Sequence, residues 1–205
     1  MLVGGSDLIR NTDNTSDGDL LIEVRFHGRG GQGVVVASEV LARAAFRMGF
    51  EISSFPFFGV ERRGAPVTAF ARLDTKPIRL KSSIYAPDYV VVLDSSLIKV
   101  IDVFEGLKQG GSALVNYPDG RRLEGLAPMY KYFVLDATSI AASHGIGSQT
   151  APIVNTAIMG GFAKMCPSVS LDPILESIRE LAPAKKDENV KAAREAYDRT
   201  VEVPQ

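Results

Sequence analysis

The chain has 205 residues and a formal net charge of −1, with acidic and basic residues interspersed. This length suits one α/β domain with a substantial core, and the balanced charge predicts no broad surface for nucleic acid or an anionic membrane. The one cysteine, Cys166, excludes a disulfide framework, a cysteine-rich zinc site and a cysteine-ligated iron–sulfur cluster within a single chain.

The first 20 residues are expected to be a flexible extension of a single α/β domain that covers residues 21–205. The polar run Asn11–Asp19 has no apolar surface to offset the entropy of ordering. No basic region precedes an apolar block at the N-terminus, and no stretch approaches the ~20 consecutive apolar residues of a membrane span. A cytoplasmic protein is therefore expected.

A glycine-rich turn between a strand and a helix organises the chain. Alternating apolar residues over Ile22–Phe26 predict the strand, and apolar residues at helical spacing over 36–48 predict the helix. Between them, Gly28, Gly30 and Gly33 have the G-x-G-x-x-G spacing. Such glycines permit positive φ and close backbone approach, so that amide N–H groups and the helix N-terminus can face an anion. A tight turn without a ligand is the alternative.

The second predicted strand argues against an ordinary NAD site. Such a site has an acidic residue at the end of that strand, where it holds the ribose 2′-OH. The strand Glu51–Phe55 carries its acid at the beginning, and Pro56 and Phe57 follow it. The NAD interpretation is therefore weakened.

The loop Pro56–Pro66 combines phenylalanines with Arg62 and Arg63. Exposed aromatic residues beside paired arginines favour an interface or a ligand rim. The alternative places the phenylalanines under the sheet and leaves the arginines solvated. After the loop, Val67–Leu73 and Ile78–Leu80 are predicted to pair as a hairpin, or as two short edge strands, antiparallel to the rest of the sheet.

Three nearly continuous apolar runs, Tyr89–Asp94, Ser112–Asn116 and Tyr132–Asp136, predict strands covered on both faces. A helix is expected over residues 97–107, after the first run. Each run ends in Asp or Asn, and these side chains should share an edge of the sheet with the glycine loop. The two aspartates are better explained as helix N-caps than as catalytic groups.

Three further helices are predicted toward the C-terminus. The first covers Ile153–Met165 and contains a glycine pair at 160–161, which costs ~1 kcal/mol per residue relative to Ala and indicates close packing against another backbone. The second opens at Pro173 with Asp172 as its cap, and the last covers residues 190–201.

The two histidines, His27 and His144, lie far apart without the spacing of metal ligands. Packed or exposed imidazoles are therefore favoured over metal ligands. Because His27 borders the glycine loop, a ligand contact there stays open. Together the elements predict an α/β fold with a doubly wound, mostly parallel, Rossmann-like sheet and an antiparallel edge hairpin.

Six segments, in order, resemble a known family. They are RFHGRGGQG (residues 25–33), FGVERRGAPV, VVVLD, FVLDATSIA, NTAIMGG and NVKAAREAYD. From about Ile22 to Val201 the chain resembles the gamma subunit, or gamma domain, of the thiamine-diphosphate-dependent 2-oxoacid:acceptor oxidoreductases, the pyruvate:ferredoxin oxidoreductase superfamily. Its ERRGAP departs from the ERRGG or QRGG of many relatives, and the N-terminal extension is not typical.

The resemblance implies a non-catalytic subunit of a complex that oxidatively decarboxylates a 2-oxoacid, usually to acyl-CoA, and passes electrons through iron–sulfur clusters to an acceptor. This chain has no cysteine array and no GDG-type diphosphate motif. Thiamine diphosphate, Mg and the clusters are therefore expected on partner alpha, beta and ferredoxin-like delta subunits. The oxoacid, whether pyruvate, branched-chain, aromatic or oxalate, and the acceptor, ferredoxin or NAD, stay open.

In the family, the gamma domain is implicated in the region where coenzyme A approaches, so the resemblance implies a site for it at the interface. The candidate residues are those of the glycine loop and two arginines: Gly28, Arg29, Gly30, Gly31, Gln32, Gly33, Arg62 and Arg63. No catalytic or metal-binding residue is expected. The alternative is a freestanding nucleotide-binding oxidoreductase of the NAD/FAD type, or a sensor module, which rests on the glycine loop alone.

Overall fold

The computed structural model describes residues 20–57, 64–118, 123 and 125–204. Residues 1–19 of the expected extension, and the candidate residues Arg62 and Arg63, lie outside the described residues. The elements in chain order are β1 (Ile22–Arg29), α1 (Val34–Arg47), β2 (Glu51–Phe57), β3 (Pro66–Asp74), β4 (Tyr89–Val92), the 3-10 helix η1 (Ser95–Lys99), β5 (Ser112–Asn116), β6 (Lys131–Leu135), α2 (Ala137–Ser143), α3 (Ala157–Met165), α4 (Leu171–Leu181), α5 (Lys186–Arg199) and β7 (Val201–Glu202).

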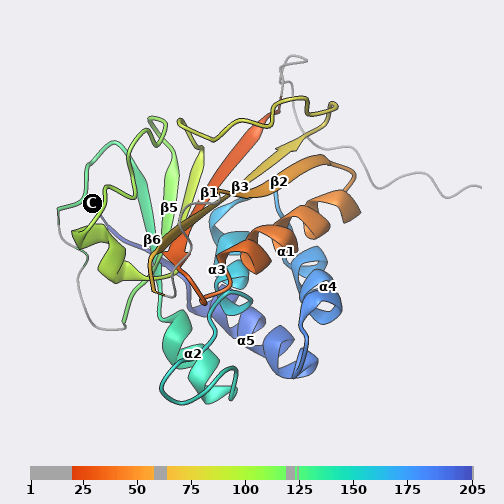
Figure 1. The fold of residues 1–205 in the computed structure, drawn as a ribbon, viewed down its shortest axis with the longest axis vertical. Coiled ribbons are helices and arrows are strands. Elements are labelled where there is room, and N and C mark those ends of the chain that lie inside the picture. Colours follow the sequence, from red (N-terminus) through yellow and green to blue (C-terminus); the bar gives the residue numbers. More distant parts are fainter. Residues whose placement is uncertain (1–19, 58–63, 119–122, 124, 205) are drawn as a thin grey trace, which may run out of the picture.

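The strands form one seven-stranded sheet in the order β2-β3-β1-β4-β5-β6-β7 (Figure 1). Neighbouring β1, β4, β5 and β6 are parallel. β2 points the same way, because it is antiparallel to β3, which is itself antiparallel to β1. β7 is antiparallel to β6. The predicted α/β fold with a mostly parallel sheet and an antiparallel edge hairpin is confirmed.

Of the two strands predicted for the hairpin, Val67–Leu73 is confirmed as part of β3, but the strand Ile78–Leu80 was wrong. β3 pairs with β1 along its whole length and with β2 from Glu51↔Asp74 to Phe57↔Thr68. Because both sides of β3 are occupied, Ile78–Leu80 is not a strand. The carbonyl groups of this segment and of the following residues instead accept hydrogen bonds from the Arg72 guanidinium.

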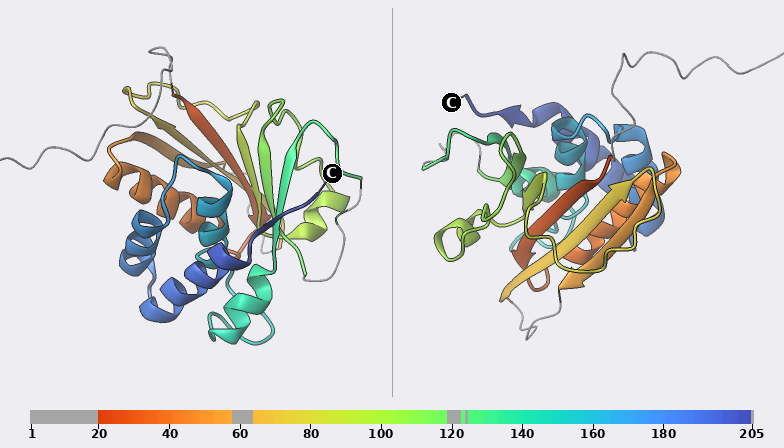
Figure 2. Two further views of the ribbon diagram at one scale, coloured as in Figure 1. Left: turned by 180° about the vertical axis from the view of Figure 1, so that it is seen from behind. Right: turned by 90° about the horizontal axis from the view of Figure 1, so that it is seen from above.

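Helices cover one face of the sheet. α1 packs on β1, β2 and β3, α3 packs on β5 and β6, and α4 and α5 lie against α1 and α3. Figure 1 and Figure 2 show these four helices grouped together, apart from η1. The predicted close packing at the glycine pair is confirmed, because a Cβ atom at Gly160 would lie 1.8 Å from the Ala193 carbonyl oxygen of α5.

Loops cover the other face over β4 and β5, and the helix predicted over residues 97–107 was wrong. Only η1 forms, and turns follow it. Gly106 has a φ of +72°, and a Cβ there would lie 2.0 Å from the Tyr85 carbonyl oxygen, so the segment folds back onto the loop before β4 instead of winding on. The apolar pattern nevertheless predicted correctly that these side chains are buried, because Leu97, Val103 and Leu107 belong to a second apolar cluster.

Two arginines are buried on this loop-covered face. Arg25 of β1 donates to the carbonyl oxygens of Ile84 and Val103 at 3.5 and 3.2 Å. Arg72 of β3 pairs with the Glu23 carboxylate at 2.9 Å. The two arginines are 8% and 2% exposed. Carbonyl and carboxylate oxygens thus compensate charges that would otherwise be costly to bury.

Three boundaries toward the C-terminus also differ from expectation. α3 begins at Ala157 and not at Ile153, α4 has Ser170 and not Asp172 as its N-cap residue, and Val201 belongs to β7. Pro173 still lies in the first turn of α4, where a missing N–H is tolerated. No helix in the described ranges is long and apolar enough to cross a membrane.

Candidate functional site

The glycine loop joins the carboxyl end of β1 to the N-terminus of α1. Gly31 and Gly33 have φ values of +96° and +75°, which side chains rarely adopt. A Cβ at Gly33 would lie 2.1 Å from Asn155 Nδ2, and one at Gly28 would lie 2.5 Å from Val34 Cγ2. Packing alone therefore requires two of the three glycines of the motif. At Gly31 a Cβ would meet no atom of the described residues within 4 Å.

No side chain caps the N-terminus of α1. Its N-cap residue is Gly33, which makes no side-chain cap, and its first turn contains no acidic residue. The first N–H groups of a helix have no partner within the helix, and they carry the positive end of its dipole. The start of α1 therefore lies at the carboxyl edge of the sheet with N–H groups that have no partner within the helix, whereas the N–H groups of Arg29, Gly30 and Gln32 are donated within the protein.

Arg29 is engaged with three neighbours at this edge. Its Nε–H donates to Asp94 Oδ2 at 3.1 Å, one Nη donates to the Gly64 carbonyl at 3.0 Å and the other to Ser96 Oγ at 2.8 Å. A guanidinium has five N–H donors, so these contacts leave two for a further acceptor. The structure therefore makes Arg29 a bridge between segments before any ligand is considered.

Gln32 joins the same cluster from within the loop. Its Oε1 accepts the Arg29 backbone N–H at 2.7 Å, and its Nε2 donates to Asp94 Oδ2 at 3.0 Å. Burial acts to raise the pKa of Asp94, but hydrogen bonds from Ser96 and Gln32 and the charge of Arg29 outweigh it and lower that pKa below its usual value. Asp94 is thus an ionised carboxylate at neutral pH.

The expected sharing of an edge between strand ends and the glycine loop is confirmed for Asp94. Its predicted capping role is confirmed too, because it accepts the Ser96 N–H, and Asp136 likewise accepts the Ser139 N–H at 2.8 Å. Asn116 instead ties β5 to α2, because its Nδ2 donates to Thr138 Oγ1 at 2.9 Å and its Oδ1 accepts the Thr138 N–H at 3.3 Å.

Sequence reasoning missed three contributors to the edge, Gly64, Ala65 and Asn155. The Gly30 N–H donates to the Ala65 carbonyl at 2.9 Å, and the Gly64 N–H donates to the Gly30 carbonyl at 3.2 Å. Contacts between backbone atoms leave no sequence signal. The predicted partner arginines, Arg62 and Arg63, immediately precede Gly64 in the sequence and lie outside the described residues.

His27, next to the loop, is a packed and neutral imidazole. Its Nε2 accepts the Arg25 Nε–H at 3.0 Å, and its Nδ1 is buried without a partner among the described residues. Burial and then the Arg25 charge lower the pKa of His27 to about 3. Nowhere in the described ranges do three or more His, Cys, Asp or Glu residues form a group that could hold a metal ion.

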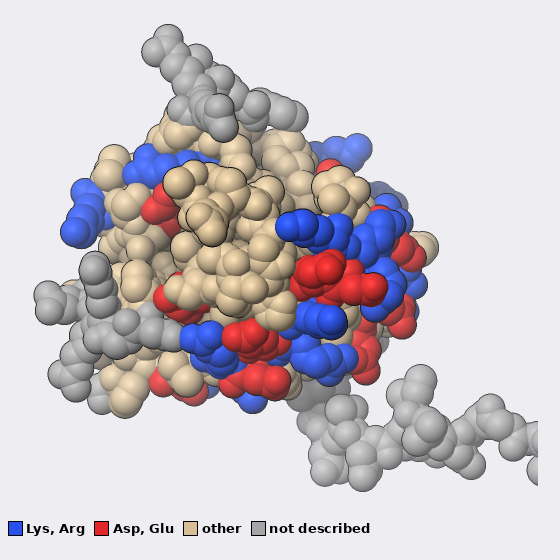
Figure 3. All heavy atoms as spheres, turned by 90° about the horizontal axis from the view of Figure 1, so that it is seen from below, with Lys and Arg blue, Asp and Glu red and all other residues tan. Residues whose placement is uncertain are grey.

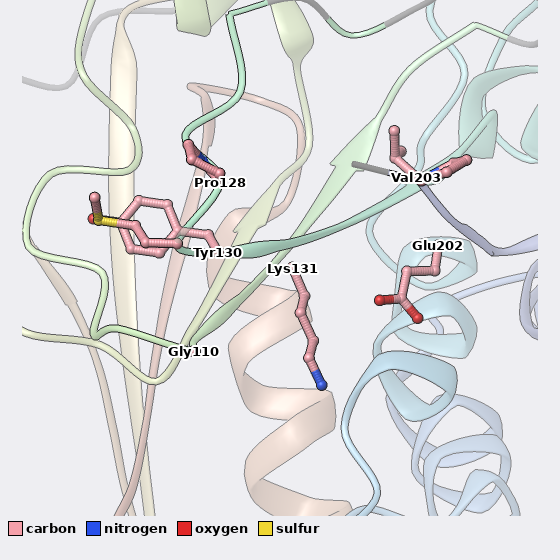
Figure 4. Close-up of a pocket in the computed structure, with 8 residues that line it drawn as sticks. Gly110, Pro128, Tyr130, Lys131, Glu202 and Val203 are labelled. Carbon is pink, nitrogen blue, oxygen red and sulfur yellow. The ribbon is translucent and has the colours of Figure 1, made fainter.

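Three surface cavities lie away from the glycine loop. The largest, about 600 Å³, lies between the turn before β6 and the end of β7, and its lining includes Tyr130, Lys131 and Glu202 (Figure 4). It is therefore at the amino edge of the parallel strands, opposite the loop. The second, about 530 Å³, lies beside α1 and includes the exposed Phe46. The third is formed by residues 98–104.

The surface at the α2 end of the molecule is uncharged over a continuous area. Figure 3 shows this area bordered by alternating basic and acidic side chains. Residues 137–163 contain no Asp, Glu, Lys or Arg, and most of residues 142–153 are exposed. Neither sign of charge dominates this face, as the balanced composition predicted.

The residues from β1 to the end of α5 match the family model described as pyruvate ferredoxin/flavodoxin oxidoreductase, over positions 23–199. The chain belongs to this family. This chain is 51% identical over 185 residues to the pyruvate/ketoisovalerate oxidoreductases common subunit gamma of Thermococcus kodakarensis. The match covers 88% of this chain and 98% of that protein. The chain is 49% identical over 180 residues to the pyruvate synthase subunit PorC of Methanothermobacter marburgensis, across 87% of this chain and 97% of that protein.

A solved structure in the pyruvate ferredoxin/flavodoxin oxidoreductase family has the same fold. The crystal structure of the pyruvate oxidoreductase subunit PORC from Thermotoga maritima matches with a TM-score of 0.74 and 32% identity, across 90% of this chain and 99% of that one. The resemblance found in the six sequence segments is thereby confirmed.

Proposed function

We propose that this chain is the gamma subunit of a 2-oxoacid:acceptor oxidoreductase complex, in which it supports assembly and the approach of coenzyme A. The observation that carries the proposal is the match over nearly the whole length of gamma and PorC subunits, 98% of the Thermococcus kodakarensis protein and 97% of the Methanothermobacter marburgensis protein. The unmatched remainder of either relative is too short to form a catalytic domain that this chain would lack.

The sheet topology disfavours the alternative, a freestanding NAD-type oxidoreductase or sensor. In a dinucleotide-binding sheet, the strand beside β1 is parallel to it and brings an acidic residue to the ribose. Here that neighbour is β3, which is antiparallel, so its amino end at Pro66 lies beside Arg29. The position of the ribose ligand is therefore taken by the start of a strand without an acid.

The redox chemistry belongs to the partners in this proposal. Oxidative decarboxylation of a 2-oxoacid needs an electron sink such as thiamine diphosphate, and electron transfer needs clusters. The one cysteine, Cys166, is fully buried, and burial raises the pKa of its thiol, so it is a packing residue. Thiamine diphosphate, Mg and iron–sulfur clusters would accordingly reside on alpha, beta and ferredoxin-like delta subunits.

The edge at the glycine loop is the place proposed for an anionic part of coenzyme A. Three observations support this. No side chain caps the N-terminus of α1, a Cβ at Gly31 would meet no described atom within 4 Å, and the contacts of Arg29 with described residues leave two of its five N–H donors. Arg62 and Arg63 stay part of the proposal as further cations from the adjoining loop.

Activity of the separated chain tests the subunit role. The chain alone, supplied with a 2-oxoacid, thiamine diphosphate, coenzyme A and a dye acceptor, is expected to give no turnover, and the co-expressed complex is expected to be active and brown with iron–sulfur absorption. Turnover by the lone chain would contradict the proposal.

A matched pair of glycines tests the coenzyme A edge. Gly31 and Gly49 lie at the two ends of α1 with φ values of +96° and +86°, and a Cβ at either would meet none of the described atoms within 4 Å. Replacement by Ala should therefore cost a similar roughly 1–2 kcal/mol of strain at both positions. Only Gly31→Ala should raise the coenzyme A concentration at half-maximal rate. An unchanged value in the Gly31→Ala complex would leave the loop with a structural role.

A further inference from the structure

The Asp94 carboxylate is saturated with hydrogen bonds from two directions. Oδ1 accepts the Ser96 N–H at 2.9 Å and the Ser96 hydroxyl at 2.6 Å. Oδ2 accepts from Arg29 Nε at 3.1 Å and from Gln32 Nε2 at 3.0 Å. A carboxylate offers about four lone-pair sites, so none is left for a ligand.

These contacts fasten three separate segments to one another. Ser96 belongs to η1, Arg29 is the last residue of β1, and Gln32 belongs to the glycine loop that follows β1. Arg29 in turn holds Gly64, whose N–H donates back to the Gly30 carbonyl. Asp94 therefore fixes the guanidinium of Arg29, the backbone of the glycine loop and the start of the chain that leads into β3.

A second aspartate at the same edge makes the same two capping contacts. Asp136 accepts the Ser139 N–H and hydroxyl, both at 2.8 Å, within the first turn of α2. Asp94 does the same for η1, but it directs its other oxygen across the sheet edge to Arg29 and Gln32. This additional pair of contacts exceeds what a cap of a five-residue 3-10 helix needs.

We infer that Asp94 is a positioning residue for the coenzyme A edge, which rests on the function proposed above. It does not touch the ligand. It aims the two unused donors of Arg29, and holds the open backbone at Gly31, toward the space that an anionic group of coenzyme A would occupy. The Gln32 amide completes the arrangement, because it links the backbone of Arg29 to the carboxylate.

Replacement by Asn breaks the arrangement in either amide orientation. If the amide –NH₂ faces Arg29 and Gln32, donors oppose donors on the loop side, and if it faces Ser96, they oppose donors on the cap side. The charge that orients the guanidinium is lost in both cases. Gln32→Ala is milder. It removes one donor to Asp94 and the acceptor of the Arg29 backbone N–H, but it leaves both the cap and the Arg29–Asp94 ion pair.

The test measures initial rates of the assembled complex against coenzyme A concentration. Asp94→Asn should raise the half-saturating concentration about 10-fold, as expected when a charge-assisted contact is misaligned, while kcat stays unchanged. Gln32→Ala should give a smaller rise in the same direction. The control Asp136→Asn makes the same change at the other capping aspartate, where the amide oxygen can still accept the Ser139 N–H, and it should leave the half-saturating concentration as it is.

The outcomes separate this inference from the proposed function. If Gly31→Ala weakens coenzyme A use while Asp94→Asn and Gln32→Ala do not, the positioning role is overturned and the coenzyme A edge stands. Equal rises in Asp94→Asn and Asp136→Asn would show a general structural effect and overturn the inference as well. If Asp94→Asn prevents assembly, Gln32→Ala decides, and an unchanged half-saturating concentration overturns the role of Asp94. No response to any of these variants, Gly31→Ala included, removes the coenzyme A edge itself.

Discussion

The two faces of the sheet are stabilised by different interactions. On the helix-covered face, side chains such as Phe26 and Phe162 are fully buried in one apolar cluster with α1, α3, α4 and α5. On the loop-covered face, Arg25 and Arg72 lie buried among backbone carbonyl groups. The first face depends on shape, because burial of apolar surface is favourable wherever packing is close. The stability of the second face depends on hydrogen bonds, for which each loop must hold its carbonyl groups close to the buried arginines.

The largest effect expected from this difference is at Arg72. Arg72→Met should lower the free energy of unfolding by about 3–5 kcal/mol. It removes the donor of several loop carbonyls and the buried partner of the Glu23 carboxylate, which keeps only the longer contact with Lys108 at 3.6 Å. The control is Arg43→Met on the helix-covered side, whose ion pair with Glu180 is about half exposed on both partners. That change should cost at most about 1 kcal/mol. Equal losses in urea unfolding would show that the two faces do not differ in this respect.

A tight contact between helices should give the next largest effect. Gly160→Ala places a methyl group 1.8 Å from the Ala193 carbonyl oxygen, a backbone atom, so α3 and α5 must separate. We expect a loss of about 1–3 kcal/mol in thermal or urea unfolding. At the neighbouring Gly161 the added methyl would meet the Thr200 hydroxyl and a Leu135 methyl group, which are side-chain atoms that can shift. Gly161→Ala should therefore cost less, and the reverse order would contradict helix packing through Gly160.

The loop-covered face should also respond to acid through His27. Its folded-state pKa of about 3 lies below the unfolded value near 6.5, so the unfolded chain binds more protons between these values and stability falls as pH falls. The loss from His27 between pH 7 and pH 5 should be about 1–2 kcal/mol. His27→Gln cannot be protonated there, and its carbonyl oxygen can still accept from Arg25. Urea titrations at both pH values compare the two proteins, and an identical pH dependence would refute the role of His27.

The exposed Phe57 should matter least for the stability of the chain. It should matter more for assembly of the complex. Phe57 lies at the end of β2 and is 55% exposed, and Phe46 of α1 is 69% exposed on the helix-covered side. Either change to Ser should alter the stability of the chain by less than about 0.5 kcal/mol. Phe57→Ser should weaken co-purification of the complex, because aromatic residues dominate interface cores. If Phe46→Ser weakens it instead, the partner binds beside α1.

The sequence predicted those elements whose residue pattern fits a single kind of secondary structure. Apolar alternation and helical spacing placed β1, α1 and the buried strands β4, β5 and β6. The pattern over residues 97–107 had two meanings, since an apolar loop packed on a sheet can show the same spacing as a helix. The turn at Gly106, made by close approach to the Tyr85 carbonyl, decided between them.

The candidate site was predictable to the level of segments and not of contacts. Glycine spacing identified the loop, and the ends of parallel strands identified Asp94 as its neighbour. The contacts of Arg29 with Gly64 and of Gly33 with Asn155 join residues distant in sequence through backbone atoms or a single amide. Neither type of contact leaves a periodicity or a motif. The resemblance to a family supplied the function, which the glycine loop alone left open.

The short strand β7 has a consequence for self-association. It pairs Val201 with Val134 and Glu202 with Phe133, and the Val203 N–H donates to the Tyr132 carbonyl at 2.8 Å. It thereby occupies the outer backbone of β6, whose sequence KYFVL is rich in residues that favour strands. An open edge of this kind is a template on which further chains can add as strands. The residues after α5, which contribute little to the core, therefore prevent further chains from pairing with β6 at this edge of the sheet.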